Sequence, residues 1–149
     1  MDLARYIASR LLRWRRENSH STEKQRFGAE GERIVARYLR RHGFRILYRN
    51  FRSPGGGEID LVCRDQREAC LVFVEVKSRQ STRFGDPSLA VRSPKQHLLI
   101  RGASAWLRLL GNSEVHCRFD IVELIGKGEF PEIRHIQNAF PVPANMTRI

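Results

Sequence analysis

Apolar side chains recur every three to four residues in three stretches of the chain, which is the spacing of an amphipathic helix. The first stretch covers residues 3–16, and the opposite side of this helix would be rich in arginine. The second covers residues 22–42 and stops before Gly43, and the third runs from Ser93 to Gly111. The pattern therefore predicts a basic N-terminal helix followed by two longer helices.

Five shorter runs are rich in branched and aromatic residues, and this composition predicts β-strands. They cover residues 44–51, 58–64, 70–78, 115–124 and 133–136. The run at 70–78 is almost continuously apolar, which is typical of a central strand that is buried on both faces. The short run at 133–136 predicts a last strand at the edge of the sheet.

The predicted elements follow the order helix, three strands, helix, strand, with the edge strand at the end. This order and the length of 149 residues predict one α/β domain, in which helices flank a mixed β-sheet. We expect the basic helix and a linker at residues 1–21, the domain at 22–137 and a C-terminal tail at 138–149.

The second and third predicted strands form a hairpin that brings charged residues together. If residues 66–69 are its loop, the antiparallel register of the two strands follows directly. The facing pairs are then Asp60 with Glu75 and Glu58 with Lys77. Because residues two apart on a strand point to the same side, all four side chains are expected on one face of the sheet.

Asp60 facing Glu75 is a like-charge pair, which destabilises a sheet unless something compensates it. Both carboxylates also lie among apolar residues, where an unpaired charge is costly or takes up a proton. A divalent cation would remove the conflict, and carboxylate oxygens favour Mg²⁺ or Mn²⁺. Lys77 would then hold a water or a phosphate beside the ion. The alternative is an ordinary strand face with a surface ion pair between Glu58 and Lys77.

The charge of the chain indicates what it can bind. Lysine and arginine number 27 against 16 acidic residues, so the formal net charge is +11 and the pI is about 10.7. Such a surface attracts polyanions: nucleic acid first, and an anionic membrane surface or an acidic protein second. Structural RNA-binding proteins are equally basic, so the charge alone does not indicate an enzyme.

The cysteines and the hydropathy pattern indicate in which cellular compartment the protein is expected. Cys63, Cys70 and Cys117 form no CxxC pair, which argues against a disulfide framework or a zinc site and predicts buried thiols in the cytoplasm. No apolar run is long enough to span a membrane, so we expect no integral membrane association.

The residues around the acidic cluster resemble those of a known group of nucleases. GEIDLV at 57–62, followed by FVEVKSR at 73–79, resembles the PD-(D/E)xK superfamily, although here glycines separate Pro54 from Asp60. More narrowly, about residues 27–125 resemble the YraN-like family of bacterial predicted nucleases, which are related to archaeal Holliday-junction resolvases. The matching positions are Gly28, Gly31 and Glu32; Tyr38, Leu39 and Gly43; Arg49 to Phe51; Gly57 to Asp60; Glu75 to Lys77; Lys95; and Arg118 to Asp120.

The resemblance implies a restriction-endonuclease-like fold and a metal-dependent nuclease that hydrolyses phosphodiester bonds. It favours DNA over RNA, and it points to branched, Holliday-junction-like DNA and to a homodimer, with a monomer as the alternative. It further implies that Asp60 and Glu75 hold Mg²⁺ or Mn²⁺, that Lys77 is the catalytic lysine and that Glu58 belongs to the same motif.

An acidic residue of the first domain helix is also implied. The resemblance assigns Glu32 to the metal site, whereas helical periodicity alone leaves Glu30 equally open. Two other functions stay open beside the nuclease: a nucleic-acid-binding module with this fold but without catalysis, and a basic interaction or membrane-surface protein.

Basic and polar residues that follow the cluster are candidates for contacts with nucleic-acid phosphates. They are Arg79, Arg83, Arg92, Lys95, Gln96 and Arg101. Taken singly, each could equally be a solvated surface residue, and Gln96 also fits a capping role at the start of its helix. Arg118 and Asp120 lie on the same side of one predicted strand and are expected to pair.

Overall fold

A computed structural model describes residues 23–79, 93–111, 115–126 and 128–147. The expected N-terminal helix at 3–16 lies outside these residues, as do Arg83 and Arg92, two of the expected phosphate contacts.

The described residues form one mixed sheet whose strands follow each other in chain order. The strands are β1 (Phe44–Arg52), β2 (Glu58–Asp65), β3 (Cys70–Arg79), β4 (Cys117–Ile125) and β5 (Glu132–Phe140). All neighbouring pairs are antiparallel except β3 and β4, which are parallel. A parallel pair needs a crossover connection, and α3 lies within it. The expected α/β fold is confirmed.

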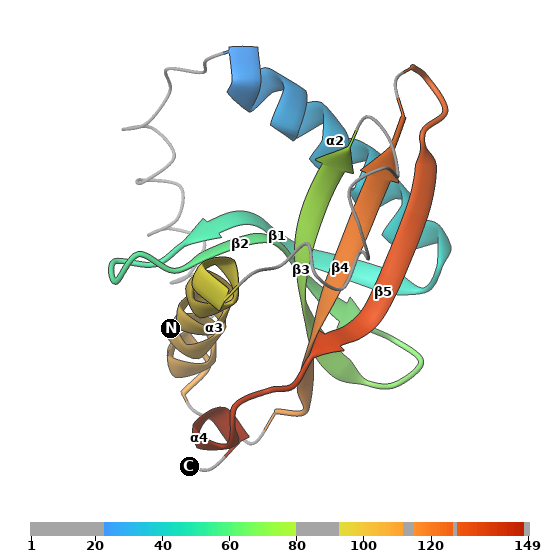
Figure 1. Cartoon of the computed structure of the whole chain (residues 1–149). Helices are drawn as coiled ribbons and strands as arrows, with labels where there is room; N and C mark the ends of the chain where they lie inside the picture. Colours follow the sequence, from blue (N-terminus) through green and yellow to red (C-terminus); the bar gives the residue numbers. More distant parts are fainter. Residues whose placement is uncertain (1–22, 80–92, 112–114, 127, 148–149) are drawn as a thin grey trace, which may run out of the picture.

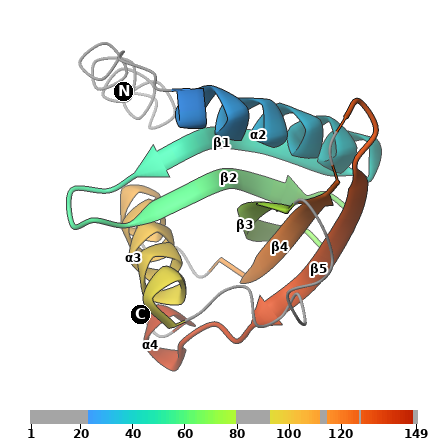
Figure 2. The ribbon, with the colours of Figure 1, turned by 45° about the horizontal axis from the view of Figure 1, so that its top comes forward.

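Two helices cover opposite faces of the sheet (Figures 1 and 2). The helix α2 (Glu23–Arg41) packs Val35, Ala36 and Leu39 on one face, and α3 (Ser93–Leu109) packs Leu99 and Trp106 on the other. Burying apolar side chains on both faces makes β3 and β4 central strands, as the apolar run at 70–78 predicted.

The C-terminal segment differs from the expected tail at 138–149. The last strand is longer than the predicted 133–136 and ends at Phe140, and a short helix, α4 (Ala144–Thr147), follows. Phe140 and Met146 are buried in the core on the α3 side. Residues of the expected tail therefore complete this core, while the proposed division into domains stays a prediction.

The three cysteines are free and buried, as the sequence predicted. Burial raises the pKa of the Cys63 thiol to about 12. Within the part of the chain that the structure describes, no helix is long and apolar enough to cross a membrane.

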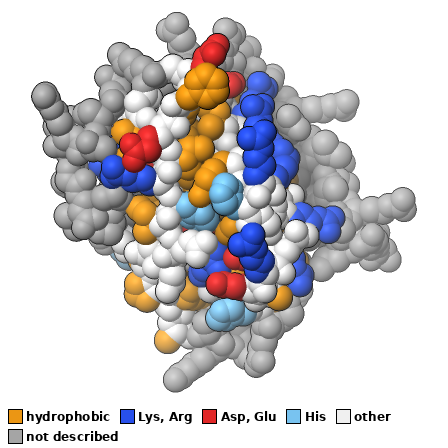
Figure 3. Space-filling view, turned by 90° about the vertical axis from the view of Figure 1, so that its right-hand side faces the viewer, with side chains coloured by type: hydrophobic (Ala, Val, Ile, Leu, Met, Phe, Trp, Pro, Cys, Tyr) orange, Lys and Arg blue, Asp and Glu red, His pale blue; other side chains and the backbone are white. Residues whose placement is uncertain are grey.

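The side of the molecule on which β5 lies carries a band of hydrophobic side chains (Figure 3). Basic side chains gather beside this band. Phe130, which precedes β5, is 93% exposed. Because β5 is the last strand of the sheet, its outer edge has no strand partner among the described residues.

The hairpin of β2 and β3 has the predicted register, but its ladder is shorter than predicted. Asp65 pairs with Cys70, and pairing continues to Leu61 with Val74, where it ends. From this point β2 stays paired with β1 and β3 stays paired with β4, so the two strands separate as a fork. Figure 1 shows the hairpin of β1 and β2 directed away from β3.

The tip of the β1–β2 hairpin is held against α3 by a close approach of two glycines. A Cβ atom on Gly57 would lie 2.3 Å from the backbone nitrogen of Gly102 and 2.6 Å from its Cα. A Cβ atom on Gly102 would lie 2.8 Å from Cγ1 of Ile59. The glycines thus fix the position of the strand that carries Glu58 and Asp60.

Replacing Gly57 by alanine is therefore expected to destabilise the fold by about 2 kcal/mol or more, because backbone atoms would have to move. Gly55→Ala is the matched control, since no atom lies within 4 Å of the position of its Cβ, and we expect a change within about 0.5 kcal/mol. Urea denaturation of both variants measures the difference. Equal free energies of unfolding would contradict the close approach.

Candidate active site

The fork between β2 and β3 is where Asp60 and Glu75 meet. Asp60 comes directly before Leu61 and Glu75 directly after Val74, the last pair of the β2–β3 ladder. The prediction that Asp60 and Glu75 are cross-strand partners is therefore wrong. Oδ2 of Asp60 instead accepts a hydrogen bond from the backbone N–H of Val76, at 2.8 Å. A carboxylate thus takes the place of a backbone acceptor at the point where the ladder ends.

Glu75 is the buried centre of the site. It is 3% exposed, and Oε1 lies 3.6 Å from Nζ of Lys77 and 3.3 Å from Nζ of Lys95. Its other oxygen, Oε2, is buried and has no hydrogen-bond partner among the residues that the structure describes. Burial and the negative charge of Asp60 raise the pKa of Glu75 to about 8. The carboxyl is therefore poorly compensated by the protein alone.

Lys95 belongs to this cluster, whereas the sequence placed it among the outer phosphate contacts. It lies in the first turn of α3 and also reaches Oε2 of Glu58, at 3.8 Å. Although burial opposes its charge, the carboxylates of Glu75 and Asp60 raise the pKa of Lys95 above its usual value. Oε1 of Glu58 also lies 3.8 Å from Nε of Arg52. The ion pair of Glu58 with Lys77, which was the alternative interpretation of the sequence, is absent from the described part of the chain.

Glu32, on α2, is coupled electrostatically to the same cluster. Its carboxylate accepts a hydrogen bond of 2.7 Å from Nδ2 of Asn50, and burial together with the charge of Asp60 raises its pKa. Glu30, the residue that periodicity could not exclude, is exposed and lies 3.7 Å from Arg33. Glu32 is thus coupled to Asp60, and its assignment to a metal site stays a prediction.

A family model described as uncharacterised protein family UPF0102 matches residues 31–124, which include Glu32, the fork and Lys95. The chain belongs to the UPF0102 family. This confirms the resemblance to YraN-like proteins that the sequence motifs carried.

The similar proteins are bacterial and carry the same family name. A UPF0102 protein of Trichlorobacter lovleyi is 48% identical over 78% of this chain and 91% of its own length. One of Geobacter metallireducens is 43% identical over 80% of this chain and 96% of its own length, and one of Symbiobacterium thermophilum is 45% identical over 78% and 97%.

Of the other expected phosphate contacts in this UPF0102 chain, Arg79 already has an acidic partner. Its Nε lies 3.1 Å from Oε1 of Glu123, which is 1% exposed. Gln96 is half-buried and Arg101 is exposed on α3. Glu123 was not predicted from the sequence. Its acidic side chain lies within an otherwise apolar run that forms a continuously buried strand, and this position was the signal that could have identified it.

Glu123 extends the cluster by one strand. It is the cross-strand partner of Lys77, so its side chain lies on the same face of the sheet as Lys77 and Glu75. The face thus carries acidic and basic groups on β3, β4 and α3.

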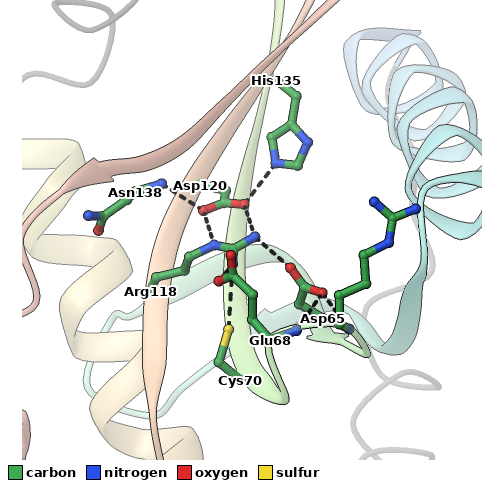
Figure 4. Close-up of polar contacts among 8 residues, drawn as sticks. Asp65, Glu68, Cys70, Arg118, Asp120, His135 and Asn138 are labelled. Carbon is green, nitrogen blue, oxygen red and sulfur yellow. Dashed lines mark hydrogen bonds and ion pairs between the residues drawn. The ribbon is translucent and has the colours of Figure 1, made fainter.

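A second polar network joins the opposite end of the β2–β3 hairpin to β4 and β5 (Figure 4). Arg118 hydrogen-bonds Asp120, as predicted, and also bonds Asp65 and Glu68 at the hairpin turn. Asp120 is further bonded to His135 and to the backbone of Asn138. Each carboxylate of this network accepts hydrogen bonds from nearby donors, so the network stabilises the fold. In this it differs from Glu75, whose charge is poorly compensated.

The charge of Glu75 itself should lower the stability of the UPF0102 fold in the absence of divalent ions. The pKa of Glu75 in the folded state is about 8, above its ordinary value of 4.5, so the free energy of unfolding falls as the pH rises between these two values. Glu75→Gln removes the titration and is expected to be about 1 kcal/mol or more stable than the wild type at pH 8.5. The advantage should shrink toward pH 4.5.

Urea denaturation in the presence of a chelator, at both pH values, measures this difference. Glu58→Gln is the control, because Glu58 is 42% exposed and its ion pairs are solvated, so we expect a change within about 0.5 kcal/mol. A Glu75→Gln variant that is less stable than the wild type at pH 8.5 would contradict the claim that the charge of Glu75 destabilises the fold.

Proposed function

We propose that this chain is a metal-dependent nuclease and that the fork of β2 and β3 is its active site. The observation that carries the proposal is the buried carboxyl of Glu75. Its Oε2 has no hydrogen-bond partner in the described part of the chain, and burial and the charge of Asp60 raise its pKa. A protein that only needed a stable sheet would gain from an apolar residue at this position. A cation that binds the carboxylates of Asp60 and Glu75 would offset their repulsion and explain why both are present.

The donor set fits a hard divalent cation. Asp60 and Glu75 supply carboxylate oxygens, and Glu58 and Glu32 are close enough to influence the same cluster. In the described residues no three His, Cys, Asp or Glu side chains stand in a ready-made arrangement for a metal. The ammonium groups of Lys77 and Lys95 lie beside Oε1 of Glu75, so Mg²⁺ or Mn²⁺ that binds this oxygen would displace them.

When bound, Mg²⁺ or Mn²⁺ would polarise the scissile phosphate and lower the pKa of a coordinated water. Lys77, which is 32% exposed, can hold a water or neutralise the negative charge that develops on the phosphate. Lys95 can do the same from α3, and it keeps its charge because acidic groups surround it. Asp60 keeps β3 in place through its bond to Val76.

Nucleic acid, and DNA before RNA, is the substrate that fits the net charge of +11. We further propose branched DNA as the preferred form and a homodimer as the assembly. The outer edge of β5 and the hydrophobic band beside it could form a two-fold interface (Figure 3). A four-way junction has symmetric strands, which two equivalent sites could cut together.

A non-catalytic nucleic-acid-binding protein is the second candidate. The positions of Lys77 and Lys95 favour it, because both ammonium groups lie beside Oε1 of Glu75 and partly offset its charge without any metal. A cation that displaces them would exclude this candidate.

Cleavage of a panel of DNA substrates tests the proposal. Four-way junction, nicked, single-stranded and duplex DNA are incubated with Mg²⁺, with Mn²⁺ and with a chelator, and the wild type is expected to cut only with metal. Sedimentation with the junction measures the assembly at the same time. Absence of cleavage on every substrate, with DNA binding retained, would favour the non-catalytic candidate.

A further inference from the structure

Five exposed arginines lie at the corner of the sheet where α2 ends, β1 begins and the β2–β3 turn lies. Arg45 and Arg64 are on the face opposite α2, because their chain neighbours Phe44 and Cys63 pack on the α2 side. This arginine corner consists of Arg40, Arg41, Arg45, Arg64 and Arg67. The turn and the end of α2 are in contact, because the backbone N–H of Gln66 donates to the carbonyl of Gly43. The side chain of Arg67 lies over Gly43, with Nε 3.4 Å from the position that a Cβ would take there.

The arginine corner contains a pair of like charges that does not stabilise the fold. Arg45 and Arg64 are direct cross-strand partners on β1 and β2, and like charges in this position destabilise a sheet. The negative end of the α2 dipole accounts for Arg40 and Arg41, but it does not account for two opposed arginines on strands.

The nearest acidic side chains do not relieve this repulsion. Asp65 and Glu68 follow Arg64 in the chain, and both are turned toward Arg118 inside the network of Figure 4. No ion pair joins the arginine corner to any acidic residue that the structure describes. The corner therefore presents uncompensated positive charge to the solvent.

The corner lies at a defined distance from the candidate active site. Arg64 is four residues from Asp60 along β2, which corresponds to about 13 Å at ~3.3 Å per residue. Arg40 is eight residues from Glu32 along α2, which corresponds to about 12 Å at ~1.5 Å per residue. Successive phosphates of one DNA strand advance ~3.4 Å along the helix axis, so either separation corresponds to about four nucleotides.

We propose that the arginine corner binds the phosphate backbone of the nucleic acid about four nucleotides from the bond that is cut. Repulsion between Arg45 and Arg64 would then be relieved in the complex, as a metal would relieve the repulsion between Asp60 and Glu75. The inference rests on the proposed nuclease function for the position of the cut, but the contact itself is measured as binding without metal. It makes the enzyme selective for polymers over short oligonucleotides.

The experiment measures binding of fluorescent duplex DNA in the presence of a chelator, over a range of salt concentrations. Arg45→Glu combined with Arg64→Glu is expected to weaken binding about tenfold and to make the salt dependence less steep by about 2, at ~0.9 for each lost phosphate contact. The control combines Arg108→Glu with Arg134→Glu, which removes the same charge from exposed positions outside the corner.

A single substitution separates binding from folding. Arg45→Glu places an acidic residue opposite Arg64, so its melting temperature should equal or exceed that of the wild type while its DNA affinity falls. A merely structural role of Arg45 predicts the opposite change in melting temperature.

Two results would overturn the inference. One is a corner double variant whose affinity and salt dependence equal those of the charge-matched control. The other is loss of binding to phosphatidylserine vesicles with unchanged DNA binding, which would assign the corner to a membrane surface. Failure of the nuclease proposal looks different, because it removes metal-dependent cleavage and leaves the binding difference intact.

Discussion

Asp60→Asn is expected to reduce metal-dependent cleavage at least about 1,000-fold, because the fork loses the charge that holds the cation beside the scissile phosphate. Glu75→Gln should have a similar effect, and Lys77→Ala should reduce the rate about 100- to 1,000-fold by removing stabilisation of the developing charge. Single-turnover rates on the best substrate of the panel measure these losses.

The matched controls for cleavage lie on α2. Glu32→Gln should lower activity because Glu32 couples to Asp60, whereas Glu30→Gln should not, since Glu30 is exposed and lies beside Arg33. Wild-type activity in the Asp60→Asn variant would place the cleavage site elsewhere.

The second large effect concerns stability. Arg118→Met is expected to lower the free energy of unfolding by about 3–5 kcal/mol, because it leaves the buried carboxylates of Asp65 and Asp120 without their cation. Arg64→Met is the control, because Arg64 is exposed and unpaired among the described residues, and we expect a change within about 0.5 kcal/mol.

The effect of Arg118→Met should depend on pH. Burial disfavours the charged forms of Asp65 and Asp120, but hydrogen bonds hold the pKa of each below its ordinary value of 3.8. This stabilisation is complete above about pH 4 and is lost as the pH falls through the lowered pKa values. The gap between wild type and variant in urea denaturation should therefore be widest near neutral pH and narrow in acid. A difference in the free energy of unfolding that grows as the pH falls would contradict the stabilising role of these ion pairs.

The local parts of the fold could be predicted from the sequence. The turn at 66–69 sets the register of its own hairpin, so the pairing from Asp65–Cys70 to Leu61–Val74 followed from counting residues. The boundaries of α2 and of β1 to β3 also followed, because period and turn residues act over a few positions. The last strand was underestimated at 133–136. Its second half departs from regular pairing near Ile136 and contains Asn138 with a positive φ, which obscures the alternation.

The parts that could not be predicted depend on contacts between distant segments. Counting residues from the hairpin turn does not show that the β2–β3 ladder stops before it reaches Asp60 and Glu75. It stops there because β2 stays paired with β1 and β3 stays paired with β4. The contact of Lys95 with Glu75 depends on how α3 lies over the sheet after its crossover. Motif resemblance selected Glu32 where periodicity could not, and the burial of Glu123 emerged only from the packing of the sheet.

The central claim is that the carboxylates of the fork bind a divalent cation. Titration calorimetry with Mn²⁺ tests it most directly, with the wild type compared to a variant that combines Asp60→Asn with Glu75→Gln. We predict a dissociation constant on the order of 1 mM for the wild type, since few protein ligands leave coordination to water and phosphate. The double variant should show no binding in this range. Equal Mn²⁺ binding by the two proteins would contradict the account.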